Sequence, residues 1–286
     1  MPPFDPRKAY APQEEGTAFF DDGREIELLH FVYSHPNIEK IRGSPNDVLA
    51  AIDEYGRAKK YLMNVGEDKG QIVTSLIADV KPKVMVELGG YVGYSCILFG
   101  DAVRKAGGQR YYSFERNPEF AAVIMSLVDI AGLSDTVKVV VGSSDASIQR
   151  LFDSGDLKHI DLMFLDHYKP AYTTDLKLCE ELGLITKGSV LAADNVVKPG
   201  NPPYLEYVRS STKEKIAKAK EPVKNGFDER FPEKNAKQYA KRVDQEKYST
   251  SKGNPYLVYK SKLIESFEPT GEPDGVEITR CVGEEM

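Results

Sequence analysis

The stretch that decides the fold reads Val84-Met85-Val86-Glu87-Leu88-Gly89-Gly90-Tyr91-Val92-Gly93-Tyr94-Ser95. A short apolar run leads into a turn with three glycines, and apolar residues at helical spacing follow over 95–105. This order predicts a buried strand, a tight turn and a helix, with the turn at a ligand-binding edge of the sheet. The glycines alone would not distinguish this turn from an ordinary strand-to-helix connection.

The middle of the chain alternates between short apolar runs and helical segments. We expect strands at 84–88, 111–114, 137–141, 162–165 and 189–193, and helices at 95–105, 118–131, near Ile148 and 173–181. Because the runs are continuously apolar, the strands are expected to be parallel and covered on both faces. Later runs at 256–261 and 276–282, with turn signals at Thr270-Gly271 and Asp274-Gly275, predict an antiparallel hairpin at the sheet edge. The expected class is α/β, Rossmann-like, with a mostly parallel sheet.

The segments that flank this pattern suggest a single domain with additions. Residues 1–24 are polar and proline-rich, which predicts a flexible tail, and 25–286 form the domain, beginning with amphipathic helices over 25–64. The charged segment 213–254 is an insertion in which few residues are apolar. It is expected to be solvated, with one or two helices, of which 233–245 is the better candidate. A docking surface for an acidic partner is the alternative.

Composition narrows the possible classes of function. The 286 residues are 41% hydrophobic and 29% charged, with a formal net charge of −6, which gives no reason to expect nucleic acid or an anionic membrane as partner. Three scattered cysteines, Cys96, Cys179 and Cys281, predict free thiols rather than a disulfide framework or a zinc site. The beginning of the chain lacks an apolar signal sequence, and no run of about 18 apolar residues occurs. We therefore expect a cytoplasmic protein.

Two acids indicate which ligand the glycine turn serves. Glu87 precedes the glycines, where a pyrophosphate would be repelled but the cationic amino-acid part of S-adenosylmethionine would be favoured. Glu115 follows the next strand, where a carboxylate can accept hydrogen bonds from two ribose hydroxyls. The order of residues also differs from the G-x-G-x-x-G pattern of nicotinamide enzymes. The sequence thus favours a methyl donor over a dinucleotide.

Two further strands end in acids, and these predict a metal site at the same edge. Asp166 follows one strand, and Asp194 and Asn195 follow the other. Three oxygen ligands without a cysteine favour Mg²⁺, although any one of these residues alone could simply cap a helix or turn. A Mg²⁺ ion with free positions suits two adjacent hydroxyls. Lys169 would stand beside this charge, which favours the neutral amine, so it could take a hydroxyl proton.

At this point the residues resemble the catechol O-methyltransferases, in a fungal-type form with a C-terminal insertion. The resemblance covers about 26–211 and resumes over about 261–282. Its most specific stretches are Met63-Asn64-Val65-Gly66, Glu87-Leu88-Gly89-Gly90-Tyr91-Val92-Gly93-Tyr94-Ser95, Phe164-Leu165-Asp166-His167-Tyr168-Lys169 and Ala193-Asp194-Asn195-Val196.

The resemblance implies a role for each matching position. The implied Mg²⁺ ligands are Asp166, Asp194 and Asn195, with Lys169 as the general base. The implied contacts to S-adenosylmethionine are Met63, Val65, Glu87, Gly89, Tyr91 and Ser95 for the methionine part, Glu115 for the ribose, and Ser144, Asp145, His167 and Tyr168 on the adenine side. The implied substrate residues are Tyr61, Asp166, Lys169, Asn195, Pro199 and Glu268, of which Glu268 would hold the second catechol hydroxyl in a catalytic role.

The chain also departs from the family pattern. Tyr61 and Tyr168 stand where the animal enzymes have tryptophan, so aromatic walls remain but the pocket width can differ. Asp145 replaces an amide and cannot donate a hydrogen bond to an adenine ring nitrogen. The insertion is absent from the animal forms.

The resemblance implies Mg²⁺-dependent methylation of one hydroxyl of a small catechol, with no nucleic-acid or membrane partner and with a monomer favoured. Three alternatives stay open: a methyltransferase for another vicinal-diol phenolic such as a caffeoyl ester, a non-catalytic S-adenosylmethionine-binding module, and a nicotinamide oxidoreductase. Glu87 disfavours the oxidoreductase, and a pure binding module would need neither the metal ligands nor Lys169.

Overall fold

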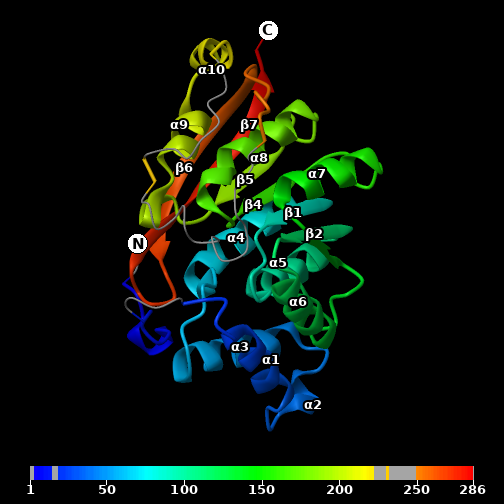
Figure 1. Ribbon diagram of the computed structural model, residues 1–286, viewed down its shortest axis with the longest axis vertical. Coiled ribbons are helices and arrows are strands. Elements are labelled where there is room, and N and C mark those ends of the chain that lie inside the picture. Colours follow the sequence, from blue (N-terminus) through cyan, green and yellow to red (C-terminus); the bar gives the residue numbers. More distant parts are fainter. Residues whose placement is uncertain (1–2, 15–18, 222–229, 232–248, 286) are drawn as a thin grey trace.

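The computed structural model describes residues 3–14, 19–221, 230–231 and 249–285. Within these ranges, seven strands form one sheet in the order β3-β2-β1-β4-β5-β7-β6 (Figure 1). The five strands on the β3 side are parallel, whereas β7 runs antiparallel to β5 and β6 antiparallel to β7. This arrangement confirms the predicted α/β class with its antiparallel hairpin at one edge.

The parallel strands lie within one residue of the predicted ranges. They are β1 (Val84–Leu88), β2 (Arg110–Glu115), β3 (Val137–Val141), β4 (Leu162–Leu165) and β5 (Val190–Ala193). In β1, Met85 belongs to the hydrophobic core on one face of the sheet, and its neighbours Val86 and Leu88 belong to the core on the other. The strands read as continuously apolar because successive side chains enter two separate cores.

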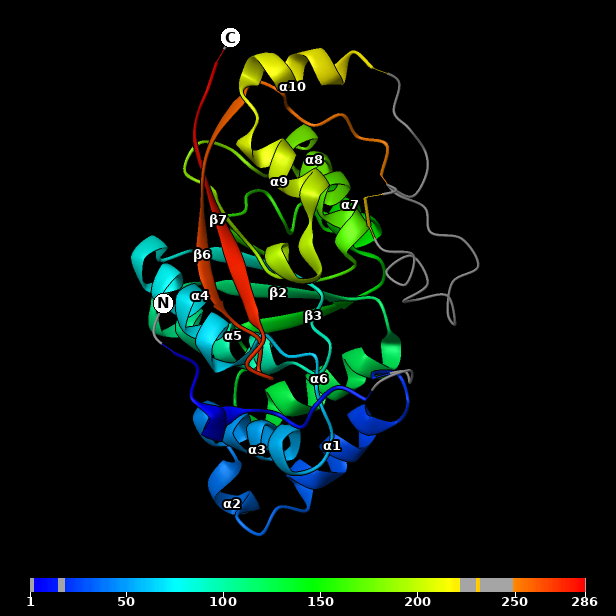
Figure 2. The same ribbon diagram turned by 90° about the vertical axis from the view of Figure 1, so that its left-hand side faces the viewer.

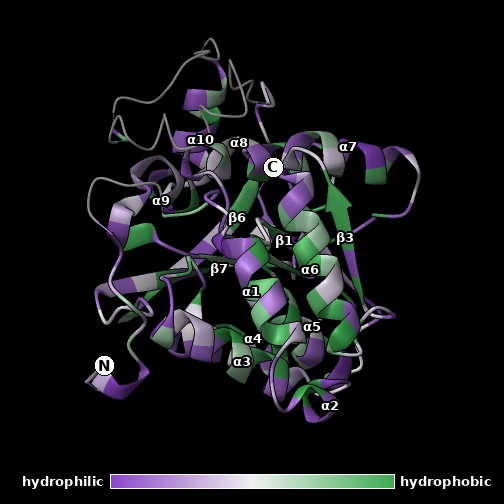
Figure 3. Cartoon of the chain, turned by 60° about the horizontal axis from the view of Figure 1, so that its bottom comes forward, coloured by the Kyte–Doolittle hydropathy of each residue, from purple (hydrophilic) through white to green (hydrophobic). Residues whose placement is uncertain are grey.

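Helices cover both faces of the sheet (Figures 1 and 2). One core is shared with α4 (Gly66–Val80), α5 (Tyr94–Lys105) and α6 (Pro118–Ile130), and the other with α7 (Ser144–Asp153), α8 (Tyr172–Glu181) and α9 (Pro202–Arg209). Helix α6 is coloured mostly as hydrophobic along its length, as expected for a helix packed against a sheet (Figure 3).

Helix α4 is an addition to the predicted elements, because no helix was expected between the N-terminal helices and β1. Its buried residues Val73, Leu76 and Ile77 recur at spacings of three and four, which is the pattern of a helix with one apolar face. The same pattern was available in the sequence. The helix matters for function because it also carries Lys69.

The N-terminal helices are α1 (Arg24–Tyr33), α2 (Ile38–Ile41) and α3 (Pro45–Ala58), which lie at one end of the molecule (Figure 1). Ahead of them, the short helix η1 (Pro6–Lys8) is followed by Tyr10, which is buried. The backbone N–H of Tyr10 donates to the carbonyl of Pro269 at 2.9 Å, so this segment contacts the tip of the C-terminal hairpin. The division into a flexible tail of 1–24 and one domain over 25–286 stays a prediction.

The C-terminal hairpin is longer than expected. Strand β6 spans Leu257–Phe267 and β7 spans Pro273–Glu284. The turn at Thr270-Gly271 is confirmed, with the N–H of Gly271 donating to the carbonyl of Glu268 at 2.8 Å. The second predicted turn, Asp274-Gly275, is wrong: both residues are buried within β7 and pair with β6. An Asp-Gly pair marks a turn when it is exposed, but here Asp274 has buried hydrogen-bond donors that keep it in the strand.

The insertion begins with α10 (Thr212–Ala219), and the better-rated helix candidate at 233–245 lies outside the described residues. Lys215 of α10 is buried, with its ammonium group 4.5 Å from the ring centroid of Tyr259 and donating to the carbonyl of Leu257. Cys96, Cys179 and Cys281 are free, as predicted, and all three are buried. Among the described helices, none combines the length and apolar character needed to cross a bilayer.

Candidate functional site

Four acids follow or end four neighbouring parallel strands. Glu87 is the last residue but one of β1, and Glu115 is the last residue of β2. Asp166 and Asp194 directly follow β4 and β5. Because these strands are parallel and adjacent, their carboxyl ends share one edge of the sheet. The tertiary structure therefore brings the predicted donor-binding acids and the predicted metal ligands to one edge.

The glycine turn closes against Glu115 and Asp166. Gly89 has φ 91°, and a Cβ there would lie 2.6 Å from the carbonyl oxygen of Asp166, so only glycine fits. The Oε2 atom of Glu115 accepts hydrogen bonds from the N–H groups of Gly90 at 3.2 Å and Tyr91 at 3.0 Å. Burial, only partly offset by these backbone hydrogen bonds, raises the pKa of Glu115 to about 7.

Glu87 is fully buried, and burial raises its pKa. One carboxylate oxygen, Oε2, accepts from the hydroxyl of Ser113 at 2.6 Å and from the thiol of Cys96 at 2.9 Å. The other, Oε1, has no hydrogen-bond partner among the described residues. A buried carboxylate oxygen without a donor is costly, and an ammonium group of a ligand would satisfy it.

Helix α1 holds the glycine turn and the wall beside it. The hydroxyl of Tyr91 donates to Glu25 at 3.0 Å, and the buried Arg24 donates to the carbonyl of Tyr61 at 2.7 Å. The ring of Tyr61 lies 6.0 Å from that of Phe19 in an edge-on contact. Tyr61, predicted as a substrate wall, is therefore anchored by residues that the sequence had not identified as part of the site.

The residues predicted to line the adenine side gather around Asp175, an acid that sequence reasoning missed. Its Oδ2 atom lies 2.9 Å from Nε2 of His167 and accepts a hydrogen bond from the hydroxyl of Ser144. The ring of His167 stacks on Tyr172 at 4.9 Å, and its Nδ1 has no partner among the described residues. An acid in the first turn of a helix commonly just favours the helix dipole, so its position in the sequence gives no sign of this role.

The remaining residues predicted to contact the donor lie close in the sequence to residues of this edge. Asp145 follows Ser144 at the start of α7, and the buried Tyr168 follows His167. Met63 is half-buried, and Val65 and Ser95 are buried, at or near the beginnings of α4 and α5. Ser95 and Asp145 belong to the helices that directly follow β1 and β3, whose carboxyl ends lie at this edge of the sheet.

Each predicted metal-binding carboxylate is paired with a lysine. Asp166 Oδ1 lies 2.9 Å from Nζ of Lys169, which begins the short helix η2 (Lys169–Ala171) and also donates to the hydroxyl of Tyr172 at 2.8 Å. Asp194 Oδ1 lies 2.8 Å from Nζ of Lys69, which is fully buried. The predicted base Lys169 thus contacts a predicted metal ligand directly.

Asn195 lies in the left-handed region, with φ 57°. Its amide Nδ2 donates to Glu268 Oε1 at 2.6 Å and to Asp274 Oδ2 at 3.0 Å. With its nitrogen engaged in this way, the amide presents its oxygen to any further ligand, which is the orientation that a hard cation requires. Glu268 and Asn195 lie together although the insertion separates them in the sequence.

Lys69 and Asp274 are two further functional candidates that sequence reasoning missed. Lys69 Nζ lies 2.8 Å from Glu268 and 2.9 Å from Asp274, besides contacting Asp194. Burial alone would lower the pKa of Lys69, but the surrounding acids raise it well above its usual value. No sequence pattern links residues 69 and 274. Of the residues described, no group of three or more acidic, histidine or cysteine side chains is placed to hold a metal ion.

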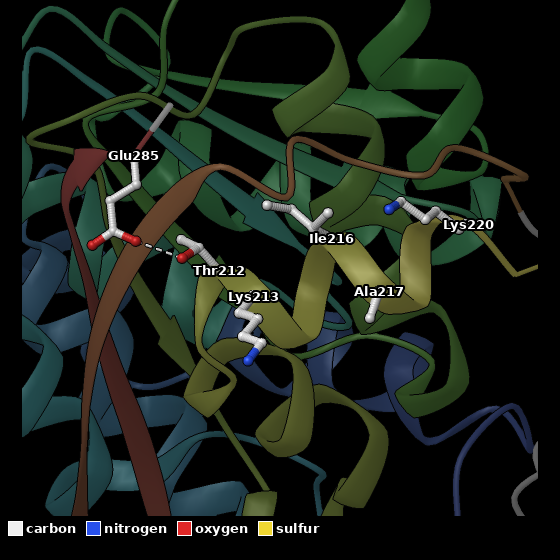
Figure 4. Close-up of a pocket in the computed structure, with 6 residues that line it drawn as sticks. All are labelled: Thr212, Lys213, Ile216, Ala217, Lys220 and Glu285. Carbon is white, nitrogen blue, oxygen red and sulfur yellow. Dashed lines mark hydrogen bonds between the residues drawn. The ribbon is translucent and has the colours of Figure 1, made fainter.

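Pro199 and one surface pocket take no part in the hydrogen bonds of this cluster. Pro199, predicted to contact substrate, is exposed in the helix η3 (Val196–Gly200) that follows Asn195. A pocket of about 410 Å³ lies over α10, and none of its lining residues was predicted as part of the site (Figure 4). The lining residues are Thr212, Lys213, Ile216, Ala217, Lys220 and Glu285.

Comparisons with known proteins identify the family and the fold. Residues 46–221 match the family model described as O-methyltransferase. The chain is 42% identical to a catechol O-methyltransferase of Bos taurus, over 66% of this chain and 68% of that protein. It is 41% identical to a catechol O-methyltransferase of Mus musculus, over 66% and 69%. An O-methyltransferase of Bacillus cereus, solved in complex with SAH, has the same fold (TM-score 0.52, 20% identity, 89% of this chain and 97% of that one).

Proposed function

This chain belongs to the O-methyltransferase family, and we propose that it transfers a methyl group from S-adenosylmethionine to one hydroxyl of a catechol in a Mg²⁺-dependent reaction. The observation that carries the proposal is that two acids at one edge of the sheet are each paired with a lysine. Asp166 with Lys169 and Asp194 with Lys69 lie at the ends of neighbouring strands, beside an amide and a further carboxylate. The catechol O-methyltransferases to which the chain is similar supply the substrate class.

The donor would bind along the β1 and β2 side of the edge. Glu87 Oε1 would accept from the ammonium group of its methionine part, and Glu115 would accept from the ribose hydroxyls. S-adenosylmethionine supplies a methyl group already activated on a sulfonium. The chain's own contribution on this side is therefore to orient the donor and to exclude water.

The metal would be held by Asp166, Asp194 and Asn195. The donor set is entirely oxygen, as Mg²⁺ prefers, and the engaged amide nitrogen of Asn195 leaves its oxygen for the ion. When bound, Mg²⁺ supplies positive charge that stabilises a phenolate oxygen and favours the neutral form of a nearby amine.

Lys169 would accept the hydroxyl proton at Nζ. Its hydrogen bonds to Asp166 and Tyr172 fix this atom beside the metal-binding edge. Glu268, whose pKa burial raises to about 8, would hold the second hydroxyl of the catechol. Tyr61 would form the wall of the pocket, since Arg24 anchors its backbone.

A methyl-transfer assay with a labelled donor tests the proposal. The purified protein is incubated with a panel of small catechols, a monophenol and a caffeoyl thioester, with and without EDTA. Transfer to the catechols that chelation abolishes is the expected result. Transfer to the thioester alone would assign a different phenolic substrate. Equal transfer with EDTA, or no transfer to any vicinal diol, would contradict the proposal.

A further inference from the structure

The Asp274 carboxylate is at the centre of the contacts around Asn195. The side chain is 2% exposed, yet it accepts four hydrogen bonds. Its Oδ2 atom accepts from Lys69 Nζ at 2.9 Å and from Asn195 Nδ2 at 3.0 Å. Its Oδ1 atom accepts from the backbone N–H groups of Val197 at 3.2 Å and Lys198 at 2.9 Å. Asp274 thus connects β7 to the loop that follows β5.

The loop after β5 turns sharply at Asn195. This residue has φ 57°, a left-handed conformation that asparagine adopts more readily than most residues other than glycine. Asp274 binds the side chain of this residue and the backbone of Val197 and Lys198 just after it. These contacts fix both the position of the Asn195 amide and the direction in which its oxygen points.

Lys69 allows this carboxylate to be buried next to others. Asp194, Glu268 and Asp274 all lie within 2.9 Å of its ammonium group. Three carboxylates this close would repel one another strongly in a dry interior, and a buried cation between them offsets that repulsion. The charge of Lys69 is the main influence that lowers the pKa of Asp274 against the effect of its burial.

We propose that Asp274 is a positioning residue for the active site: with Lys69 as its counter-charge, it holds the Asn195 amide oxygen toward the metal position and keeps Glu268 beside it. This inference rests on the proposed function. It assigns a role to Asp274 that follows from its four hydrogen bonds rather than from contact with substrate or metal.

Two substitutions distinguish the effect of the position of the Asp274 carboxylate from the effect of its charge. Asp274→Asn keeps the shape but loses the charge, and its amide would face the donors of Lys69 and Asn195. Asp274→Glu keeps the charge but displaces the oxygens by one methylene. Glu277→Gln is the matched control, because Glu277 is also fully buried on β7 but its carboxylate pairs with Arg209 at 2.7 Å rather than with Asn195.

The readout is binding of Mn²⁺ alone, from the electron paramagnetic resonance signal of the free ion, together with steady-state kinetics. Both Asp274 variants are expected to weaken Mn²⁺ binding by about 10- to 100-fold, the usual effect of losing a group that orients a metal ligand. The KM for catechol should rise, while the dissociation constant of the donor stays within about twofold. The control should match the wild type.

Wild-type Mn²⁺ affinity in either variant would overturn the positioning role, and Asp274→Glu alone decides the question if Asp274→Asn does not fold. A loss in Asp274→Asn with normal binding in Asp274→Glu would show that charge alone matters, which also overturns it. Failure of the proposed function looks different: the wild-type protein would then neither bind Mn²⁺ nor methylate a catechol.

Discussion

The sheet edge that carries the four acids has two halves, and the carboxylates of each half have partners of a different kind. On the β1 and β2 side, Glu87 and Glu115 accept hydrogen bonds from a hydroxyl, a thiol and backbone N–H groups. On the β4 and β5 side, Asp166 and Asp194 each lie within 2.9 Å of a lysine ammonium group. We refer to these as the neutral-donor half and the lysine-paired half.

The difference indicates what each half is prepared to bind. Carboxylates that are buried without a counter-charge favour a cationic ligand, because such a ligand removes a desolvation cost that the fold carries. Carboxylates already paired with lysines have their charge balanced, so a divalent ion there must replace those contacts. Under the proposed function, the first half would hold the sulfonium donor with its ammonium group, and the second would hold the metal and the ionising hydroxyl.

Chelation is expected to have the largest effect and to act on one half only. EDTA should reduce methyl transfer to catechol by about 1000-fold or more, since a metal supplies several kcal/mol of stabilisation to developing negative charge. Binding of S-adenosylhomocysteine, measured by calorimetry, should change less than about twofold. Equal loss of both would show that the two halves do not work separately.

Removing the proposed base comes next. Lys169→Ala should lower kcat by about 10²- to 10⁴-fold, the usual contribution of a positioned general base, and leave donor affinity intact. Lys177→Ala is the control, because Lys177 contacts the ring of Tyr207 on another part of the molecule. Near-normal turnover in Lys169→Ala would remove it from the mechanism.

The neutral-donor half is tested by Glu87→Gln. Loss of a charge-assisted hydrogen bond costs about 1.5–3 kcal/mol, so donor binding should weaken by about 10- to 100-fold. Mn²⁺ binding should be unaffected. A donor analogue without the amino group should bind the variant and the wild type alike, and unchanged affinity for the complete donor would contradict the role assigned to Glu87.

The smallest expected effect is a pH dependence of donor binding. Burial raises the pKa of Glu115 to about 7 in the free protein, and the ribose contact needs the carboxylate. Above this pH the group is ionised and the affinity is constant; below it, the dissociation constant should rise toward about tenfold per pH unit. Glu115→Gln should bind more weakly and remove this slope, and a slope that persists in the variant would assign it to another group.

Most of the fold could be predicted from the sequence, and the reason is physical. The parallel strands are covered on both faces, so their apolar runs are continuous, and the bounds of β1, β3 and β4 match the expected ranges. The prediction failed where the neighbouring residues in the sequence suggest one structure and the contacts in the folded chain impose another. Asp274-Gly275 has the composition of a turn but lies in β7, because its contacts come from helix α4 and the loop after β5.

The candidate site divides in the same way. Glu87, Glu115, Asp166 and Asp194 were recognised because each stands beside its strand in the sequence, where the topology alone brings strand ends together. Lys69, Asp175 and Asp274 were missed because each joins the site through a contact with another helix, strand or loop of the chain, which no local pattern reveals.

By itself the sequence determined the order of the strands along the chain, the glycine turn and the acids at the strand ends, since hydrophobic periodicity and residue type are local properties. The tertiary structure decided which charge each acid faces. The balance of buried charge depends on distances between segments up to 205 residues apart, such as Lys69 and Asp274, and no local pattern encodes those distances.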